Sequence, residues 1–393
     1  MNIDEKNISL ENRRAGEEVN YPIFLKGEFD DAEKFMPMPT PTGDAPFRLD
    51  IKKVIEDSLE KEMVFHVVGD SGSAKDLSFQ RLLAQQLIKQ SREGRTEDRP
   101  QFLYHLGDIV YDHGEAHEYA AQFFEPFEEY PGPIFSIPGN HDGEINPLSE
   151  TPYESLDAYM QVFCSKEPID VPFSKGSSRK SMIQPNVYWT LNTPLANIVG
   201  LYGNVAKFGV IKPDQREWFV HELKEAAKQK DDCALIVCVH QSPFSADTNH
   251  GSSLAMVDFL EQAYTEADVK PDLVLSGHVH NYQRFMRRYS DGTKVPYIVA
   301  GAGGYTVLHP IASRNDASID TDSALLKNVV LQKYCTKQYG FLKLKIKKKM
   351  GALRLIGEYY TIPRGAEPDT GFTAELFDRF EFPVRRPEPV LCL

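Results

Sequence analysis

The stretch Gly107-Asp108-Ile109-Val110-Tyr111 decides the predicted fold of this chain, and an apolar run from Phe102 to Leu106 leads directly into it. Such a run is typical of a buried strand, so we expect Asp108 just beyond a strand's carboxyl end. In an open α/β sheet, ligands and metal ions gather at the carboxyl ends of the strands. Asp108 and Tyr111 are therefore predicted to face one crevice.

Two neighbouring apolar runs end in the same way. Residues 63–68 run into Gly69-Asp70, and residues 133–137 run into Gly139-Asn140-His141-Asp142. The segments at 76–94 and 117–127 have apolar residues near helical spacing, so we expect a helix in each. These strand–loop–helix units predict several strands that end at one edge of a sheet.

Further strand patterns follow in the second half of the chain. They cover residues 187–191, 198–202, 234–239, 273–276 and 297–300, and the segments 339–346 and 352–360 resemble a hairpin that turns at Met350-Gly351. A helix containing Trp218, Phe219 and Leu223 separates two of them. This mixture predicts an α/β fold, a four-layer α/β/β/α sandwich with two mixed β-sheets flanked by helices.

The predicted domain organisation has three parts. Residues 1–60 are a mostly irregular N-terminal lead-in, residues 61–362 form the main domain, and residues 363–393 form a C-terminal extension. Within the main domain, residues 143–185 are rich in Pro, Ser, Tyr and Lys, and we expect surface loops with short helices around the mouth of the crevice.

The charge of the chain restricts its partners. Its 393 residues include 44 Lys and Arg against 57 Asp and Glu, a formal net charge of −13. Such a surface repels nucleic acids and anionic membranes, so we expect neither as a partner. The basic run from Lys343 to Lys349 fits a solvated strand face better than an anion site. Any anionic substrate then needs a local positive potential, which metal ions supply.

The N-terminus and the cysteines indicate the compartment. Residues 1–6 carry no apolar segment of the kind found in signal peptides, and no apolar run approaches the length of a membrane span. The five cysteines are odd in number and widely scattered, which argues against a disulfide framework. We therefore expect a cytoplasmic protein.

The polar residues at the predicted strand ends form one set of metal ligands. The set is Asp70, Asp108, Tyr111, Asn140, His240, His278 and His280. It contains no cysteine, which excludes a structural zinc site of the thiolate type. Seven ligands exceed the needs of one transition ion but fit two ions that share a carboxylate. Taken singly, each motif also fits an ordinary turn, and His240 alone would fit a core histidine.

Five blocks together resemble the calcineurin-like metallophosphoesterases, and within them the purple acid phosphatases. The blocks are Gly69-Asp70-x-Gly72, Gly107-Asp108-x-x-Tyr111, Gly139-Asn140-His141-Asp142, Val237-x-x-His240 and Gly277-His278-x-His280. Most relatives carry Asp-x-His in the first block. This chain has Gly72 at the histidine position and Tyr111 in the next block, the same exchange that purple acid phosphatases make.

The resemblance implies a division of the ligands between two ions. Asp70, Asp108, Tyr111 and His280 would hold Fe(III), for which a hard phenolate is a suitable ligand. A divalent ion, Zn, Fe or Mn, would be held by the bridging Asp108 together with Asn140, His240 and His278.

The resemblance also implies an activity. We expect a dinuclear phosphatase that hydrolyses small phosphate monoesters by attack of a metal-bound hydroxide. His141 is the expected acid for the leaving group, Asp142 is expected to orient its other nitrogen, and His250 is a second acid candidate. One alternative is a phosphodiesterase acting on cyclic-nucleotide or phospholipid-type diesters at the same centre. The other is a non-catalytic metal-binding scaffold, which the presence of every ligand and of His141 disfavours.

Overall fold

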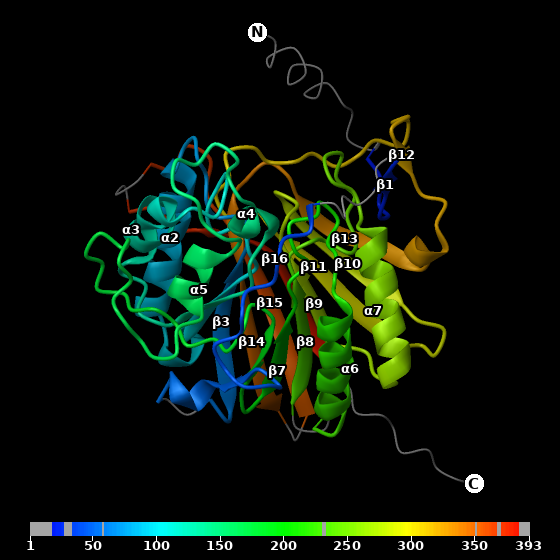
Figure 1. The fold of residues 1–393 in the computed structure, drawn as a ribbon. Helices are drawn as coiled ribbons and strands as arrows, with labels where there is room; N and C mark the ends of the chain where they lie inside the picture. The colour runs from blue at the N-terminus through cyan, green and yellow to red at the C-terminus, as the bar shows by residue number, and fades with distance from the viewer. Residues whose placement is uncertain are drawn as a thin grey trace.

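Two β-sheets packed face to face form the centre of the protein (Figure 1). The computed structural model describes residues 18–26, 34–56, 59–229, 233–349, 352–367 and 371–384. The first sheet has eight strands in the order β13 (Val329–Cys335), β10 (Tyr282–Arg288), β11 (Lys294–Ala300), β9 (Leu273–Ser276), β8 (Ala234–Val239), β7 (Ala196–Gly200), β6 (Trp189–Asn192) and β2 (Arg48–Asp50).

The second sheet has six strands. Their order is β16 (Glu375–Pro383), β15 (Ala352–Thr361), β14 (Gly340–Lys349), β3 (Glu62–Val68), β4 (Phe102–His105) and β5 (Ile134–Ser136). Strands β3, β4 and β5 are parallel to one another, whereas β14, β15 and β16 pair in antiparallel fashion. A separate short pair joins β1 (Phe24–Leu25) to β12 (Ile319–Asp320).

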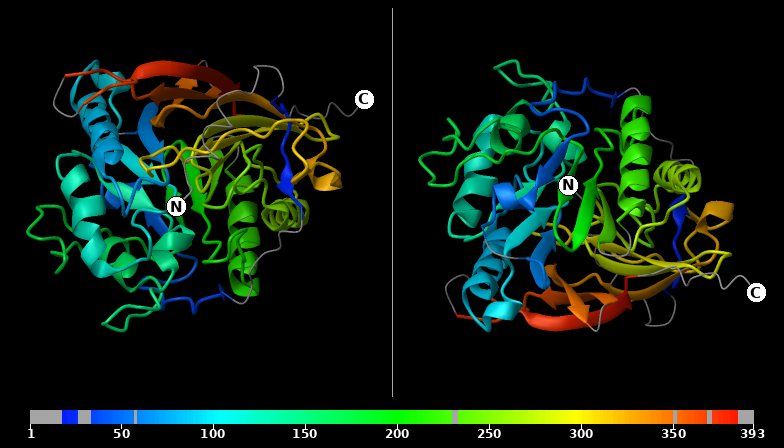
Figure 2. Two further views of the ribbon diagram at one scale, coloured as in Figure 1. Left: turned by 90° about the horizontal axis from the view of Figure 1, so that it is seen from above. Right: turned by 90° about the horizontal axis from the view of Figure 1, so that it is seen from below.

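Helices cover the outer faces of both sheets, as the views along the layers show (Figure 2). On one side lie α2 (Ser78–Arg92), α3 (Glu125–Phe127) and α5 (Asp157–Phe163), and on the other lie α6 (Pro213–Ala227) and α7 (Leu254–Ala267), while the short α4 (Asn140–Gly143) lies at the edge where the strands end. Single helical turns occur at Ile51–Lys53, Thr96–Asp98, Ala116–Glu118, Ala120–Phe124 and Ala324–Leu326. Among the described helices, none is both long and apolar enough to cross a membrane. The predicted four-layer α/β/β/α sandwich is confirmed.

Apolar side chains from both sheets meet in one buried layer. Phe65 and Tyr104 from the six-stranded sheet pack in the same cluster as Ile198, Ile236 and Leu275 from the eight-stranded sheet. Removing such side chains from water is the main favourable contribution to folding. This layer fixes the two sheets against each other and therefore fixes the relative positions of their strand ends.

Strand β14 shows how the sequence pattern matches its place in this layer. Leu344 and its alternate neighbours are buried between the sheets, while the intervening lysines point to the other face. Lys343 pairs with Glu358 at 2.8 Å and Lys345 with Glu62 at 2.9 Å. These two lysines are mostly buried rather than solvated, because acidic side chains of the neighbouring strands neutralise them.

The segment expected as one helix at 117–127 differs from the prediction. It consists of a 3-10 turn, the π-helical turn η5 (Ala120–Phe124) and the short α3. Pro126 lies at the start of α3 and has no N–H to donate to the preceding turn, which favours a break there. Turns of the π type often occur beside functional sites, and Gln122 of η5 contacts the predicted metal ligand Tyr111.

Two segments outside the predicted main domain take part in the sheets. Strand β16, from the expected C-terminal extension, pairs with β15, and β2, from the expected lead-in, pairs with β6. The 143–185 insertion is more than surface loops, because Tyr159 and Phe163 of α5 are fully buried in the outer core. The predicted turn at Met350-Gly351 lies outside the described residues.

A buried polar cluster connects β16 to the opposite sheet. Asp378 of β16 accepts hydrogen bonds from Tyr282 Oη and Arg284 Nε of β10, each at 2.8 Å. The side chains of Arg284 and Asp378 are only 13% and 8% exposed. Removing one member of a buried pair leaves an uncompensated charge, which is costly.

We therefore expect Asp378→Ala to lower the free energy of unfolding by about 3 kcal/mol, measured by urea denaturation. The exposed pair between Arg92 and Glu129 provides the control. Glu129→Ala should cost less than about 1 kcal/mol, because exposed ion pairs contribute little. An Asp378→Ala protein that unfolds at the wild-type urea concentration would contradict the role given to this cluster.

Candidate metal centre

The seven predicted ligands meet at one edge of the two stacked sheets, at the top in Figure 1, where α4 lies. Asp70 follows β3, Asp108 and Tyr111 follow β4, and Asn140 lies at the start of α4, immediately beyond β5. His240 follows β8, and His278 and His280 follow β9. All seven are buried.

Four donor atoms surround the first position. Tyr111 Oη lies 2.8 Å from Asp108 Oδ2, 3.4 Å from Asp70 Oδ1 and 3.4 Å from His280 Nε2. His280 Nε2 lies 3.6 Å from Asp70 Oδ1. Donors that bind one ion at about 2.1 Å lie about 3.0 to 3.4 Å apart, so this spacing suits a single ion.

Four donor atoms also surround the second position. His240 Nε2 lies 3.2 Å from Asn140 Oδ1, 3.3 Å from Asp108 Oδ2 and 3.3 Å from His278 Nδ1. Donor atoms of Asp108, His240 and His278 all lie within 4.8 Å of one another. Asp108 Oδ2 is common to both sets, so the geometry places this oxygen between the two positions.

The protonation of the ring nitrogens shows why these atoms fit a cation. His240 Nδ1 is 2.8 Å from the carbonyl oxygen of Leu106, and His280 Nδ1 is 3.2 Å from that of Val307. A carbonyl oxygen only accepts, so each Nδ1 carries a proton and each Nε2 is the nitrogen that faces the other donors. Against the opposing effect of burial, the charge of Asp108 raises the pKa of His240 to about 9, so an ion that binds to His240 Nε2 displaces the second proton of this ring.

The two carboxylates each divide their oxygens between the backbone and the centre. Asp70 Oδ2 accepts from the His278 N–H at 2.8 Å, and Asp108 Oδ1 accepts from the His141 N–H at 2.9 Å. The other oxygen of each carboxylate faces the donor sets. These backbone bonds fix the side-chain orientations without occupying the atoms needed for an ion.

Three ligands have left-handed backbone conformations, with φ of 58° at Asp70, 55° at Asp108 and 67° at His278. Residues other than glycine rarely adopt this region, and such strain persists only where the surroundings enforce it. Each lies just past a strand of the parallel core. The shared conformation turns each side chain back over the end of its sheet.

Asp142 has a different role from the expected one. Its carboxylate accepts four backbone N–H groups, those of Asp108, Ile109, Val110 and Gly139. The His141 side chain is instead oriented by the carbonyl oxygen of Asp112, which lies 2.7 Å from His141 Nδ1. Asp142 therefore holds the loop that carries Asp108 and Tyr111, and the expectation that it orients His141 was wrong.

The exchange between Gly72 and Tyr111 has a steric basis. A Cβ at Gly72 would lie 2.4 Å from the carbonyl oxygen of Ile109 and 2.5 Å from Gln122 Oε1. Gln122 in turn receives the Tyr111 N–H at 2.9 Å and donates to the Tyr111 carbonyl at 2.7 Å. The backbone that positions Tyr111 thus occupies the space that a side chain at position 72 would need.

His141 and His250 both line the pocket at the centre. The His141 ring lies 4.4 Å from that of Tyr111, and the His250 ring lies 4.2 Å from that of His278. Burial lowers the pKa of His250 to about 3, so its imidazole is neutral in the metal-free protein. His250 Nδ1 has no partner among the described residues.

The ligand pKa values follow from burial and neighbouring charges. Burial lowers the pKa of His278 and His280 well below the usual range, which keeps both imidazoles neutral as metal binding requires. Burial, followed by Asp108 and Asp70, raises the pKa of Tyr111 well above its usual range. A phenolate at Tyr111 therefore needs the charge of a bound cation.

The sequence analysis did not single out Tyr305 and His309, which line the pocket, or Asp247, which pairs with His309. Asp247 lies 3.3 Å from His309 Nδ1, and the His309 ring stacks on that of His280 at 4.3 Å. The Tyr305 ring lies 4.5 Å from that of Tyr111. The sequence Gly301-Ala302-Gly303-Gly304, after the expected strand at 297–300, gives no indication that the following residues return to the centre.

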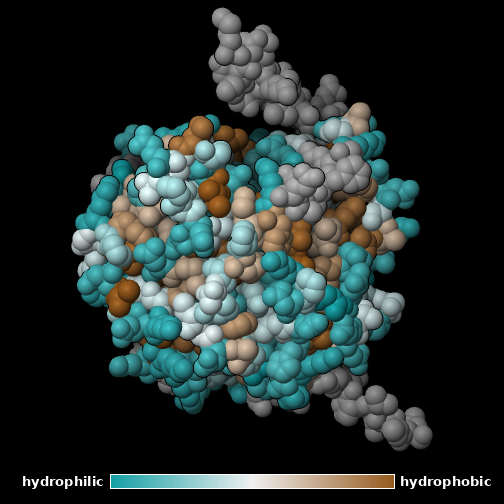
Figure 3. Space-filling view, in the orientation of Figure 1, coloured by the Kyte–Doolittle hydropathy of each residue, from teal (hydrophilic) through white to brown (hydrophobic). Residues whose placement is uncertain are grey.

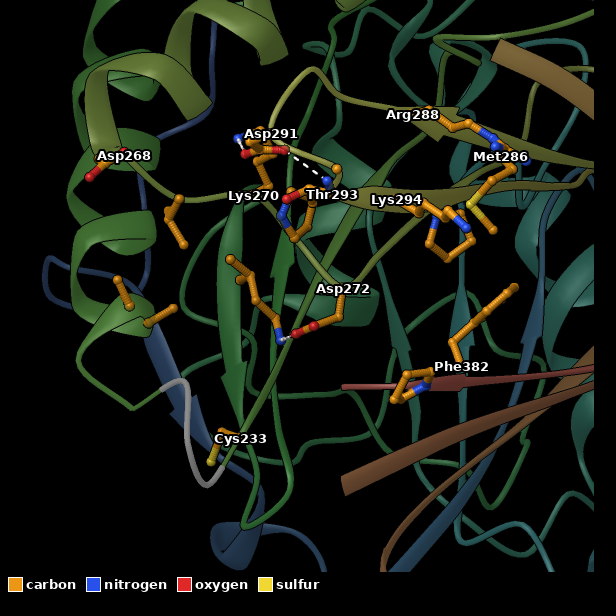
Figure 4. A pocket seen from close by; sticks show the side chains of 18 of the residues that line it. Cys233, Asp268, Lys270, Asp272, Met286, Arg288, Asp291, Thr293, Lys294 and Phe382 are labelled. Atoms are coloured by element: carbon orange, nitrogen blue, oxygen red, sulfur yellow. Dashed lines mark hydrogen bonds and ion pairs between the residues drawn. The ribbon is translucent and has the colours of Figure 1, made fainter. Parts of the chain in front are cut away.

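The pocket over the centre has a volume of about 560 Å³. A larger cavity of about 1040 Å³ lies elsewhere, lined by Asp272, Lys270 and Asp291 among others (Figure 4). Lys270 and Asp291 form an ion pair with each other at 2.8 Å, and none of the seven ligands lines that cavity. The face in Figure 3 is mainly hydrophilic, with apolar residues scattered over it. Because predicted metal ligands line the 560 Å³ pocket and not the larger cavity, the smaller pocket is the candidate functional site.

We expect Gly72→Ala to shift the segment around Ile109 and to lower the free energy of unfolding of the metal-free protein by about 1 to 3 kcal/mol. Urea denaturation measures this change. The same substitution should weaken metal binding, because Gln122 could no longer hold Tyr111 in place. Wild-type stability together with wild-type metal content would contradict the steric account.

Comparison with known proteins agrees with the geometry. The model of the calcineurin-like phosphoesterase family matches residues 63–282, more than half of the chain. Uncharacterized protein Rv2577 of Mycobacterium tuberculosis is 25% identical over 164 residues, which cover 39% of this chain and 28% of that protein. Probable purple acid phosphatase 20 of Arabidopsis thaliana is 27% identical over 157 residues, covering 39% of this chain and 32% of that protein.

The chain thus matches less than a third of the length of these relatives. Among solved structures, one described as the structure of PhoD overlaps 88% of this chain and 71% of its own, with a TM-score of 0.49 and 13% identity.

Proposed function

Because the chain belongs to the calcineurin-like phosphoesterase family, we propose that it is a dinuclear metal-dependent phosphomonoesterase of the purple acid phosphatase type. Family membership gives the general class, a hydrolase of phosphate esters. The observation that carries the finer proposal is the division of seven donors into two sets that share Asp108 Oδ2. The presence of the Tyr111 phenol among the donors, together with a glycine at position 72, supports the purple acid phosphatase type.

The residues of each set suit different ions. Asp70, Tyr111 and His280, with Asp108, would hold Fe(III), since hard oxygen donors predominate. Asn140, His240 and His278, with Asp108, would hold a divalent ion such as Zn, Fe or Mn. When bound, the two ions would neutralise charge on the phosphoryl oxygens and lower the pKa of the attacking water.

His141 is the proposed acid for the leaving group. Its Nδ1 is held by the Asp112 carbonyl, so the ring is fixed, and the side chain reaches the pocket beside Tyr111. A positioned imidazolium can deliver the proton that a departing alkoxide requires. His250, a neutral imidazole against His278, is instead suited to contact the phosphoryl group by hydrogen bonding.

Metal content and colour test the ligand assignment. The purified protein should contain two metal ions per chain and be pink to violet, because a phenolate bound to Fe(III) absorbs visible light by charge transfer. Tyr111→Phe should bleach the colour while the fold is retained by circular dichroism. A colourless wild-type protein with full metal content would contradict Tyr111 as a ligand of Fe(III).

Leaving-group dependence tests His141. We expect His141→Ala to lower kcat/KM by about 100-fold or more for alkyl phosphates, whose leaving groups need a proton. The loss for p-nitrophenyl phosphate should be much smaller, because p-nitrophenolate leaves without one. Equal losses for both substrates would remove His141 as the acid. In the wild-type protein, a preference for bis(p-nitrophenyl) phosphate over the monoester would favour the phosphodiesterase alternative.

A further inference from the structure

The segment after the 301–304 turn forms one wall of the metal pocket. Tyr305, Val307 and His309 line the pocket, whereas Thr306 points away and hydrogen-bonds to Ser73 Oγ at 2.7 Å. Alternate residues of an extended segment project to the same side, which explains the pattern. The wall is therefore built from every second residue of a short run.

This wall is attached directly to the first ligand set. The Tyr305 N–H donates to the carbonyl oxygen of Asp70 at 3.1 Å, and the Val307 carbonyl accepts from His280 Nδ1 at 3.2 Å. The Tyr305 ring also packs against the rings of Tyr111 and His280, at 4.5 and 4.4 Å between centroids. These bonds place the wall at a fixed position relative to Asp70 and His280 of the first ligand set.

The wall presents apolar surface to the metal pocket. Val307 is 52% exposed and Tyr305 is half-buried. The large apolar side chains exposed on the described surface also include Leu148, Ile169, Val330 and Leu376, and of this group only Val307 lines the metal pocket. Single exposed apolar residues are common. Beside a tyrosine ring in a ligand pocket, such a residue indicates where the apolar part of a ligand lies.

We propose that Tyr305 and Val307 form a binding wall for a planar aromatic leaving group attached directly to the ester oxygen, as in an aryl phosphate. This inference rests on the proposed phosphomonoesterase function and specifies its substrate class. Tyr305 contacts two metal ligands, so a ring that packs on it lies next to the phosphorus. A nucleobase would lie further away, because a ribose separates it from the phosphate.

Equilibrium binding of phosphonates tests the wall without the bias that aryl groups leave more easily than alkyl groups. The metal-loaded protein is titrated with benzylphosphonate, ethylphosphonate and the phosphonate analogue of adenosine monophosphate, in each of which a carbon replaces the ester oxygen, with calorimetry as the readout. We expect benzylphosphonate to bind roughly tenfold more tightly than ethylphosphonate, and more tightly than the nucleotide analogue, because ring packing adds affinity.

Substitutions test whether Tyr305 and Val307 cause this preference for the aromatic ligand. Val307→Asn and Tyr305→Leu should each reduce the ratio of benzylphosphonate to ethylphosphonate affinity by about threefold or more, whereas Val307→Ile and Tyr305→Phe should retain it. Val330→Asn is the matched control, because Val330 is 45% exposed and lies on β13, away from the pocket. Metal content is measured for every variant, since Tyr305 touches two ligands.

An unchanged affinity ratio in both Val307→Asn and Tyr305→Leu would overturn the proposal that these two residues form an aryl-binding wall. Tighter binding of the nucleotide analogue would also overturn it. Either result leaves the proposed function intact if the wild-type protein hydrolyses phosphate monoesters. Conversely, a metal-loaded wild-type protein that binds benzylphosphonate selectively but hydrolyses no monoester would overturn the proposed function and support the wall as a binding site.

Discussion

The close approach of electron-donating atoms in a buried space is the constraint on which this structure depends. Tyr111 Oη and His240 Nε2 lie 2.8 and 3.3 Å from Asp108 Oδ2, in a region that water barely reaches. Burying polar and charged groups together costs free energy unless each is hydrogen-bonded, paired or bound to a cation. The surrounding fold must therefore hold these side chains in place, and its unusual features serve that purpose.

Features of the backbone do most to hold these side chains in place. The left-handed residues at Asp70, Asp108 and His278 aim their side chains across the sheet edge, and Asp142 holds the loop after β4 by accepting three of its N–H groups. The Gln122 side chain hydrogen-bonds to both the backbone N–H and the backbone carbonyl of Tyr111. A site built from backbone strain and buried hydrogen bonds is rigid before any ligand binds, which favours metal binding in one defined geometry.

The layered fold and the convergence of the seven metal ligands could both be predicted from the sequence, because both follow from local patterns. Apolar runs mark buried strands, and polar residues just after them mark the sheet edge. The roles of Asp142 and Tyr305 could not be predicted in this way. Asp142 looks like a partner of its neighbour His141, yet it bonds to a loop some thirty residues earlier. Tyr305 reaches the centre only through a turn whose direction depends on tertiary packing. The irregular helix at 116–127 likewise reflects contacts of Gln122 that periodicity does not encode.

The origin of the donors has a consequence for the whole molecule. In each set, some donors follow strands of the six-stranded sheet and others follow strands of the eight-stranded sheet. An ion bound by either set would therefore act as a cross-link between the two halves of the sandwich. Ligands that bind only the folded state stabilise it by a free energy that rises with the logarithm of their concentration. The supply of metal in the surroundings would thus influence the folding stability of the chain as well as its chemistry.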